Sequence, residues 1–587
     1  MNHFFCFALL AALFLGHQGT AQVVQPLQAP SHAKGISMGP TGLESIGTGV
    51  FFDPALAREA GQWNPTITQV HKPLPERIED INEEALKTQA KLELIQQYPN
   101  GWPNIENAQR SASSNPSIGK EWENLGAGGW IPPDNTGAIS GDGWIVSAKN
   151  SQIGYYDVDG NTSGEWSLSD FFSPVYFTDN YVYDPRVEYS NYHDKWIVVA
   201  LGGAAQNNTN VLVAFSISNN PNDGFWLYNL GGGNCSPGNV WFDYPKTAVS
   251  ATELFVTGNL FNNDGFFQQA TIYQIELADA WTGGSITYQW YCAVPDATGF
   301  SSLASSIVPL GSAWTASSPG MTLVAQWEGA MTYYYIDNSL DNNPSLTAFP
   351  VSGDVFAEAA GDVFQLGSSQ TLDGGGNRLR DGFFYNGTIH AVHNVAGQDG
   401  FWKLRYAQID YNTGQATVFA DYGATGFDYN YPSIDPWGTT GSDWDGSVVM
   451  GFLRSSSTIY PEFRAVHFDN GWGESFVLKE GVSPIESERW GDYIDGAVRE
   501  NQGQIEVWLF GQYGQGSQYG NWVTQLTDSD PVCPYDLNSD GNVTISDVLL
   551  ILSEFGCSAN CTADLNGDGT VTVEDLLVML SGFLNGC

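Results

Sequence analysis

Tyr183-Asp184-Pro185-Arg186-Val187-Glu188-Tyr189, with Lys195-Trp196-Ile197-Val198 close behind it, sets the pattern for the middle of this 587-residue chain. An acidic residue beside a proline precedes a short apolar strand, and a second apolar strand follows after a turn. Short runs of Val, Ile, Tyr, Trp and Phe between Gly, Asn, Asp and Pro clusters are typical of β-strands joined by tight turns. This texture continues from Trp122 to Leu526, so the sequence predicts an all-β domain over residues 121–528.

The unit recurs along this domain, and the number of copies indicates the architecture. The interval between Lys246 and Arg380 has room for one further unit, around Ser305 to Tyr335, which makes seven. Four strands per unit fit the spacings, so the sequence predicts a seven-bladed β-propeller, with six or eight blades as alternatives. The recognisable copies are Asp134–Ile139, Asp184–Val187, Asp243–Lys246, Arg380–Phe383, Asn430–Ile434 and Gly491–Ile494.

This region resembles secreted bacterial β-propeller proteins and, more distantly, sialidase-like propellers. The resemblance rests on the residue pattern of Tyr183–Tyr189 and of the apolar strand that follows it. Propellers of the latter kind usually carry Asp-box hairpins of the form Ser-x-Asp-x-Gly-x-Thr-Trp, and the sequence has none. The resemblance therefore implies a fold and does not imply sialidase activity.

Two segments precede the propeller. Residues 1–21 contain an apolar run followed by small residues, which is typical of a signal peptide and predicts a secreted, extracellular or cell-surface protein. Residues 22–120 are polar and Pro-rich, with one amphipathic helix expected from Ile78 to Tyr98, and we interpret them as a leader or propeptide-like segment. No other apolar run approaches the roughly 18 residues of a membrane span, so none is expected after signal removal.

Charge and cysteine content narrow the function classes further. Sixty-four acidic residues against 21 basic ones give a formal charge of −43, which disfavours binding to nucleic acid. Of seven cysteines, Cys6 would be lost with the signal peptide, and an even number in an oxidising compartment favours disulfides. We expect Cys235–Cys292, Cys533–Cys557 and Cys561–Cys587, while Cys557–Cys561 with Cys533–Cys587 is the alternative for the tail.

The last 55 residues, 533–587, contain two loops with the oxygen spacing of a calcium site. Calcium needs six to eight oxygen ligands, and alternate residues of a tight turn supply them while a glycine at position six permits the bend. Two copies in fixed phase, each entering an apolar helix, predict two Ca²⁺ ions whose binding is coupled to folding. The expected ligands are Asp536, Asn538, Asp540, Asn542 and Asp547 in the first loop and Asp564, Asn566, Asp568, Thr570 and Asp575 in the second.

This tandem of Asp-x-Asn-x-Asp-Gly loops, each ending in Asp and running into one helix, resembles the type I dockerin repeat, a small all-α EF-hand-like domain. The resemblance implies docking to a cohesin-like or cell-surface partner. Positions ten and eleven depart from the usual Ser or Thr, since they are Ile545-Ser546 and Val573-Glu574. Calcium binding is therefore the stronger expectation, and cohesin docking the weaker.

The propeller offers a candidate site but no catalytic motif. Charged residues of the repeated unit should converge on the central channel, where they could clamp an acidic sugar and perform acid–base cleavage, or could simply be scaffold ion pairs. We interpret His390 and His393 as ordinary histidines of a β-domain. The candidates are Asp184, Arg186, Asp243, Arg380, Asp381, Arg489 and Asp492, with Asp134 and Lys246 beside them.

Three functions from different classes remain open at this point. The first is a secreted, calcium-binding propeller that binds extracellular carbohydrate or protein. The second is a polysaccharide-degrading enzyme, either a glycoside hydrolase or a lyase, that uses the channel carboxylates and arginines. The third is a structural component of a cell surface or matrix, anchored by its tail.

Overall fold

The computed structural model describes residues 30, 35–59, 68–69, 78–106, 116–126, 130–176, 181–297, 304–311, 319–327, 330–353, 358–438, 444–501, 504–528, 535, 537, 544–558, 561–566 and 569–585. The predicted signal peptide lies outside these ranges, as do Cys533, Cys587 and most of the first calcium loop.

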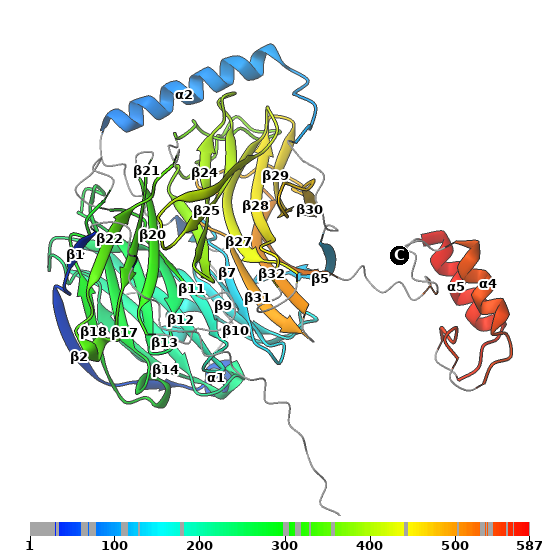
Figure 1. Cartoon of the computed structure of the whole chain (residues 1–587), viewed down its shortest axis with the longest axis horizontal. Helices are drawn as coiled ribbons and strands as arrows, with labels where there is room; N and C mark the ends of the chain where they lie inside the picture. The colour runs from blue at the N-terminus through cyan, green and yellow to red at the C-terminus, as the bar shows by residue number, and fades with distance from the viewer. Residues whose placement is uncertain are drawn as a thin grey trace, which may run out of the picture.

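Seven four-stranded antiparallel sheets form the body of the protein (Figure 1). We number them as blades in chain order. Blade 1 has β7 (Thr136–Ile139), β8 (Ile145–Lys149), β9 (Gln152–Tyr156) and β10 (Thr162–Ser167); blade 2 has β11 (Val182–Ser190), β12 (Lys195–Ala205), β13 (Asn208–Ser216) and β14 (Phe225–Gly231); blade 3 has β15 (Trp241–Val249), β16 (Glu253–Phe261), β17 (Phe267–Glu276) and β18 (Ser285–Tyr291). Blade 4 has β19 (Val308–Leu310), β20 (Met321–Trp327), β21 (Ala330–Ile336) and β22 (Leu346–Pro350); blade 5 has β23 (Leu379–Tyr385), β24 (Thr388–Ala396), β25 (Trp402–Asp410) and β26 (Ala416–Tyr422). Blade 6 has β27 (Asp428–Pro436), β28 (Val448–Ser456), β29 (Ile459–Phe468) and β30 (Phe476–Lys479); blade 7 has β31 (Asp495–Asn501), β32 (Gln504–Gln515), β33 (Gln518–Thr527) and, from earlier in the chain, β5 (Ser117–Glu123).

The blades close into a ring, which confirms the predicted seven-bladed propeller. The innermost strand of each blade packs beside that of the next, from β7 round to β31, and β31 packs beside β7. Blade 7 joins both ends of the domain, because β5 pairs with β33. The predicted domain boundary at residue 121 therefore falls inside a strand.

Alternating side chains of the middle strands hold neighbouring blades together. In β12, Ile197, Val199 and Leu201 pack against blade 3. The intervening Trp196, Val198 and Ala200 pack against blade 1. Since both faces of a blade are buried, its strands read as continuous apolar runs rather than as apolar and polar residues in alternation. A separate apolar cluster fills each of the seven interfaces between blades.

Three short strands near the N-terminus, which we call the N-terminal belt, extend the outer edges of three blades. They are β1 (Ile36–Met38), β2 (Gly42–Thr48) and β3 (Val50–Phe52), and they pair with β22, β18 and β14 of blades 4, 3 and 2. The short helix α1 (Pro54–Glu59) continues to β10 of blade 1. Figure 1 shows the belt in dark blue along the rim. Residues 36–59 are thus part of the propeller, whereas the sequence pattern indicated a separate leader.

The predicted helix near residue 78 is confirmed as α2 (Ile78–Gln97), which lies across one end of the propeller (Figure 1). Its Lys91 is buried, and Lys91 Nζ donates to Asp428 Oδ1 of blade 6 at 2.8 Å. The same nitrogen donates to the carbonyls of Gly361 and Asp362, at 3.0 and 2.8 Å. The helix is therefore fixed to the ring by a buried, fully hydrogen-bonded cation.

The remaining elements are small. A two-stranded parallel pair joins β4 (Thr68–Gln69) to β6 (Trp130–Ile131), and α3 (Leu168–Phe172) follows blade 1. In the tail, α4 (Ile545–Ser553) and α5 (Val573–Asn585) pack on each other around Ile551, Val571 and Met579. Among the described residues, no helix has the length and apolar character needed to cross a membrane.

Candidate functional site in the propeller channel

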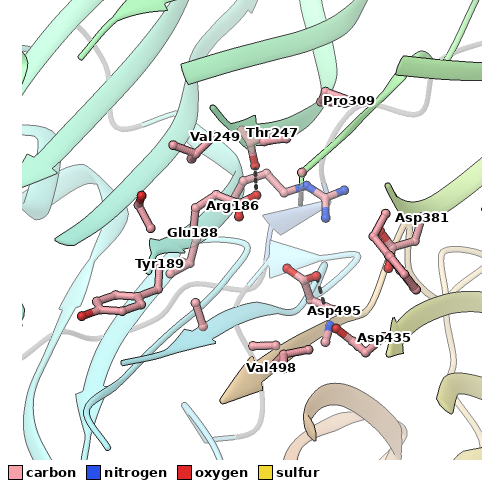
Figure 2. Close-up of a pocket in the computed structure, with 18 of the residues that line it drawn as sticks. Arg186, Glu188, Tyr189, Thr247, Val249, Pro309, Asp381, Asp435, Asp495 and Val498 are labelled. Atoms are coloured by element: carbon pink, nitrogen blue, oxygen red, sulfur yellow. Dashed lines mark hydrogen bonds between the residues drawn. The ribbon is translucent and has the colours of Figure 1, made fainter. Parts of the chain in front are cut away.

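The seven innermost strands surround a cavity of about 200 Å³, which we call the channel cavity. Every innermost strand contributes lining residues. The cavity reaches Asn191 and Tyr192, which are exposed in the turn between β11 and β12, so this end is its mouth. The charged side chains that line it are Lys246 and, labelled in Figure 2, Arg186, Glu188, Asp381, Asp435 and Asp495.

A repeated backbone irregularity positions these side chains. In β11, β15 and β27 the strand register shifts at Asp184, Tyr244 and Tyr431, whose φ angles are 48°, 58° and 52°. Asp134 and Ser306, just ahead of β7 and β19, each have a φ of 48°. A β-bulge re-aims side chains, and left-handed φ is rare for residues other than Gly, Asn and Asp. The same strained conformation in five blades marks the inner end of the channel, opposite the mouth, as a candidate functional site.

Four carboxyl groups gather beyond the inner end of the cavity, and we call Asp134, Asp184, Asp243 and Asp492 the carboxyl cluster. The backbone N–H of Asp492 donates to Asp134 Oδ1 at 2.6 Å, and that of Tyr244 donates to Asp184 Oδ2 at 3.2 Å. Burial and the neighbouring carboxyls raise the pKa of Asp134 and Asp243 well above the usual range. The same causes raise the pKa of Asp184 to about 6. Burial and mutual repulsion therefore disfavour the simultaneous ionisation of Asp134, Asp184 and Asp243.

Two cations line the inner end of the cavity and share one aromatic ring. The Arg186 guanidinium carbon lies 3.3 Å from the centroid of the Tyr493 ring, and its Nε donates to the Pro245 carbonyl at 2.9 Å. Lys246 Nζ lies 5.3 Å from the same centroid and donates to the Arg380 carbonyl at 2.6 Å. Burial and the nearby Arg186 charge lower the pKa of Lys246 well below its ordinary value. The face of an aromatic ring partly replaces the lost hydration of such cations.

Four carboxyl groups face the cavity, one each from β11, β23, β27 and β31. Glu188 Oε1 accepts from the Thr247 hydroxyl at 2.7 Å, and Asp495 Oδ2 accepts from the Thr136 hydroxyl at 2.5 Å. Asp381 Oδ2 accepts from the backbone N–H of Ile434 at 2.9 Å. Burial is the main cause that raises the pKa of Glu188 to about 8 and that of Asp495 to about 6. These groups can therefore exchange protons near neutral pH.

Asp435 is the fourth of these carboxyls and the least satisfied. In the part of the chain that the structure describes, its Oδ2 has no hydrogen-bond partner. It packs over Gly496, where a Cβ would come within 1.8 Å of that oxygen. Burial, followed by the charges of Asp381 and Asp495, raises the pKa of Asp435 well above the usual range.

The structure brings the seven sequence-predicted candidates together around the channel axis, in two places. Arg186 and Asp381 line the cavity itself, together with Lys246. Asp184, Asp243 and Asp492 form the carboxyl cluster with Asp134, and Arg489 pairs with Asp492. Arg380 lies beside the cluster, since its Nη1 donates to the Asp492 carbonyl at 3.2 Å and to the Tyr244 hydroxyl at 2.5 Å. A catalytic role for any of them stays a prediction.

Sequence reasoning missed Glu188, Asp435 and Asp495. A signal for the first two was present, because inward-facing residues of a strand recur every second position. Glu188 follows Arg186 by two residues, and Asp435 follows the bulge residue Tyr431 by four, as Glu188 follows Asp184. The repeated unit supplied the candidates, and each of these three carboxyls lies one position beyond the end of its copy.

The two histidines of β24 make ordinary protein contacts. His390 Nδ1 lies 2.7 Å from the Tyr406 hydroxyl, and His393 Nδ1 lies 2.9 Å from the Asn394 carbonyl. Within the described ranges, no group of three or more His, Cys, Asp or Glu side chains is arranged to hold a metal ion.

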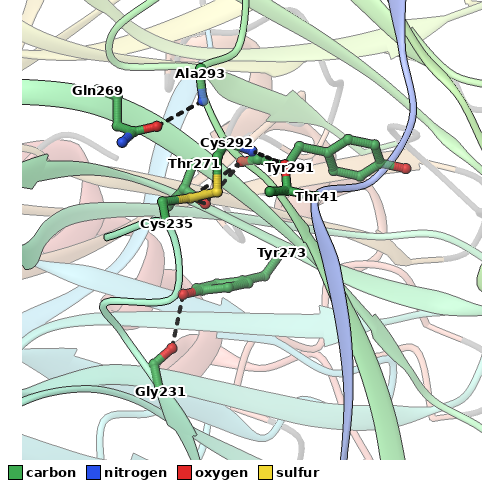
Figure 3. Close-up of a disulfide and its surroundings, with 9 residues drawn as sticks. All are labelled: Thr41, Gly231, Cys235, Gln269, Thr271, Tyr273, Tyr291, Cys292 and Ala293. Atoms are coloured by element: carbon green, nitrogen blue, oxygen red, sulfur yellow. Dashed lines mark hydrogen bonds between the residues drawn. A yellow bond between two sulfur atoms is a disulfide. The ribbon is translucent and has the colours of Figure 1, made fainter. Parts of the chain in front are cut away.

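The predicted disulfide of the propeller is confirmed. Cys235 and Cys292 are bonded in blade 3, with their Cα atoms 5.4 Å apart (Figure 3). The backbone N–H of Cys292 donates to the Thr41 hydroxyl at 2.9 Å, so the disulfide lies where the N-terminal belt reaches blade 3. The bridge and the belt therefore stabilise the same edge of the ring.

The preferred tail pairing is wrong, and the alternative is confirmed where the structure describes it. Cys557 is bonded to Cys561, with Cα atoms 5.9 Å apart, so neither Cys533–Cys557 nor Cys561–Cys587 can form. The turn after α4 brings these two cysteines together, since the backbone N–H of Cys557 donates to the Glu554 carbonyl at 2.8 Å. Glu554 also accepts from the backbone N–H of Thr562 at 2.8 Å. Cys533 and Cys587 lie outside the described residues.

In the second predicted calcium loop, two of the predicted ligands accept hydrogen bonds from the backbone of the turn. Asp575 Oδ1 accepts from the backbone N–H groups of Leu565 and Asn566, at 2.9 and 3.1 Å. Asp564 Oδ2 accepts from the backbone N–H of Gly569 at 2.8 Å. The carboxylate of position twelve is thus bonded to the backbone of positions two and three, and that of position one to the backbone of position six; carboxylate oxygens are the donors that a hard cation such as Ca²⁺ prefers. Asp568 lies outside the described residues.

The first loop is described only at its end. There Thr544 and Asp547 form a capping box at the start of α4, in which Asp547 Oδ2 accepts from the backbone N–H of Thr544 at 2.8 Å. Asp536, Asn538, Asp540 and Asn542 lie outside the described residues. Their predicted ligand roles remain predictions.

Comparison with known proteins assigns the tail and leaves the propeller open. Residues 534–584 match the dockerin type I domain. The tail is therefore a dockerin domain, of a class that binds calcium in general and typically binds cohesin. No match to the chain is found among curated proteins.

Solved structures with related folds align only weakly. One is a Trypanosoma rangeli sialidase in complex with 2,3-difluorosialic acid, at 10% identity and a TM-score of 0.33, where the alignment covers 66% of this chain and 59% of that one. Another is an endo-arabinase from Bacteroides thetaiotaomicron, at 13% identity and a TM-score of 0.27, covering 48% and 92%. A third is the catalytic domain of a Coprinopsis cinerea α-L-arabinofuranosidase, at 11% identity and a TM-score of 0.25, covering 49% and 92%. Alignments this weak support no inference about activity.

Proposed function

We propose that this chain is an extracellular carbohydrate-binding protein, whose propeller channel receives a single sugar residue and whose dockerin domain attaches it to a cohesin-bearing partner. The observation that carries the proposal is the channel cavity. It is enclosed by seven strands, opens at Asn191 and Tyr192, and is lined by six charged side chains.

The size and chemistry of the cavity suit a sugar residue better than a large apolar ligand. Its volume of about 200 Å³ is below the roughly 300–1,000 Å³ of sites for drug-sized ligands. Carboxyl groups such as Glu188 and Asp495 accept and, when protonated, donate hydrogen bonds. A polyhydroxyl ring offers both donors and acceptors, so it can satisfy these groups.

The dockerin domain in the tail would attach the protein to its cohesin-bearing partner. Each loop is proposed to hold one Ca²⁺, and without the ions the three carboxylates of each loop would repel one another. On α4, Ile545, Leu549 and Leu552 are 70%, 58% and 49% exposed. Exposed apolar residues in this number on so short a helix are typical of a protein-binding surface, which is consistent with cohesin docking.

Glycoside cleavage is the second candidate, and one observation favours it. Glu188, whose pKa is raised to about 8, and Asp495, whose pKa is raised to about 6, line the same cavity. A protonated carboxyl beside an ionised one is the arrangement of a general acid with a nucleophile or base in glycosidases. In this alternative Glu188 donates the proton and Asp495 acts as the base.

Binding and cleavage are separated by one set of measurements on the full chain. Isothermal titration calorimetry with a panel of neutral, amino and acidic oligosaccharides should give binding that Asp495→Asn weakens at least tenfold. Asp264→Asn is the matched control, because Asp264 is an exposed carboxyl in the turn between β16 and β17 and does not line the channel cavity. New reducing ends or unsaturated products would favour the enzyme. If no glycan of the panel binds or is cleaved, the proposal is wrong and a structural role is favoured.

A further inference from the structure

The channel cavity contains more carboxyl groups than cations. Glu188, Asp381, Asp435 and Asp495 face it, against only Arg186 and Lys246. If all six side chains were ionised, the cavity would carry a net charge of −2, from four negative and two positive groups. A buried net charge is unfavourable, so the cavity must take up protons or a cation.

The cations present do not neutralise these carboxyls directly. Among the described residues, none of the four forms an ion pair with a lysine or arginine side chain. Arg186 and Lys246 are instead directed at the Tyr493 ring and at the carbonyls of Pro245 and Arg380. Burial raises the pKa of Asp381 and Asp495, and the charges of Lys246 and Arg186 lower it, so the two cations compensate this carboxyl-rich wall of the cavity only in part.

One oxygen of this wall lacks any partner. Asp435 is 8% exposed, and its Oδ2 accepts no hydrogen bond within the described part of the chain. Buried polar atoms are satisfied in the great majority of cases, so an exception needs an explanation such as a missing ligand. Burial also raises the pKa of Glu188 to about 8 and that of Asp435 well above its usual range, which favours protons on both. A cationic ligand would take the place of those protons.

The charge of the whole molecule acts in the same direction. The chain carries a formal charge of −43, and such a field attracts cations to a cleft and repels anions. An acidic sugar would have to enter against this field and then lie beside four carboxyls.

We propose that the sugar residue bound in the channel cavity carries a protonated amine, and that Glu188, Asp435 and Asp495 surround its ammonium group. An ammonium group has three N–H donors and so can satisfy three carboxyl oxygens at once. Arg186 and Lys246 then face the ring hydroxyls. This inference rests on the proposed function, and it reverses the acidic-sugar clamp that the sequence suggested.

Three monosaccharides that have the same ring and differ in charge test this proposal. Calorimetric titration of the full chain should give a Kd for D-glucosamine at least tenfold lower than that for D-glucose, with D-glucuronate the weakest. Equal or tighter binding of glucose or glucuronate would overturn the amine preference while leaving carbohydrate binding intact. No binding by any of the three, together with no binding across the oligosaccharide panel, would overturn the proposed function as well.

Variants and proton counts give the decisive comparison. Glu188→Gln and Asp435→Asn should each reduce the glucosamine-to-glucose affinity ratio at least fivefold. Asp264→Asn should leave the ratio unchanged. Titrations in two buffers of different ionisation enthalpy should show proton release on binding of glucosamine to the native chain. An unchanged ratio in both channel variants, or no proton release, would contradict the proposal.

Discussion

The hydroxyl of Ser475 donates a 2.7 Å hydrogen bond to Oε1 of Glu106, although the two residues are 369 positions apart in the sequence. Tyr429 donates to the same oxygen at 2.9 Å, and Arg454 Nη1 lies 3.2 Å from it. Glu106 belongs to the segment between α2 and β5, and its partners belong to blade 6. The segment before the propeller is therefore joined to the ring at a point far from the N-terminal belt.

Replacing Glu106 should destabilise the fold strongly. Glu106→Gln leaves the Arg454 and Arg464 charges with one anion fewer, and losing one partner of a buried ion pair costs about 3–5 kcal/mol. We expect a loss of about 3 kcal/mol in the free energy of unfolding, measured by urea denaturation at pH 7. Glu486→Gln, at an exposed carboxyl, is the control and should be within 0.5 kcal/mol of the native chain, roughly the effect of a surface substitution.

The pH dependence of this effect has a defined sign. Burial opposes ionisation of Glu106, but hydrogen bonds from Tyr422 and Ser475 and the charge of Arg464 bring its pKa below the ordinary value of 4.5. A carboxyl with a depressed pKa stabilises the fold above its unfolded-state pKa, and this contribution is lost as pH falls through the folded-state pKa. The difference between native chain and variant should therefore shrink below about pH 4.5. A constant difference from pH 7 to pH 3 would contradict this assignment.

The buried pair Lys91–Asp428 should show strong coupling. Lys91→Met leaves Asp428 as an uncompensated buried carboxyl in contact with the backbone N–H of Trp402, and we expect a loss of about 3 kcal/mol. Asp428→Asn alone should also destabilise. The double variant should be more stable than the sum of the two losses predicts, by about 1–3 kcal/mol in a double-mutant cycle. Strictly additive losses would mean that the pair does not hold α2 on the ring.

The contribution of Glu188 to stability should depend on pH in the opposite direction to that of Glu106, because the folded-state pKa of Glu188 is raised. Between the ordinary value of 4.5 and about 8, the folded state retains a proton that the unfolded chain has released. Stability contributed by this site therefore falls as pH rises through that window and stays low above it. At pH 9, Glu188→Gln should be more stable than the native chain by about 2–4 kcal/mol, with little difference at pH 4. Thermal unfolding across this pH range measures it, and a variant that is less stable at pH 9 would contradict the assignment.

The blades were predictable because their signal is carried by side chains. Ile197, Val199 and Leu201 are apolar for one interface, and Val198 and Ala200 are apolar for the other. The N-terminal belt was not predictable in this way. Main-chain hydrogen bonds to the blade edges hold it in place, and its Leu43 and Val50 are 61% and 44% exposed. Its apolar residues therefore follow no pattern from which these strands could be predicted.

The channel was predictable in part for a related reason. Asp184 and Arg186 stand out because a bulge beside proline repeats from blade to blade. Asp495 does not, because only ring closure brings blade 7 beside blade 1 and places this carboxyl in the channel cavity. The partner of Cys557 could not be decided from the sequence, because Cys533 and Cys561 lie on either side of it. The turn after α4 decides in favour of Cys561.

Calcium removal should unfold the tail and spare the propeller. The apolar core of the tail, around Ile551, Val571 and Met579, forms a cluster separate from those of the blades. Saturation at 100 times the Kd stabilises a site by about 2.7 kcal/mol, and the ions also neutralise repelling carboxylates. We expect two Ca²⁺ per chain by equilibrium dialysis, and rapid proteolysis within residues 535–585 after chelation, while the propeller fragment persists.

Point variants assign the second ion to its loop. Asp564→Ala combined with Asp575→Ala removes positions one and twelve, and with them the acceptors of the backbone N–H groups of Gly569 and Leu565. This variant should bind one ion fewer and should be cleaved near α5 even in calcium. Glu574→Gln is the control, because Glu574 is an exposed neighbour at position eleven and provides no predicted ligand. If the double variant still binds two ions, the second loop is not a calcium site. The two carboxylates that it lacks both hold the turn together and supply negative charge to the predicted site.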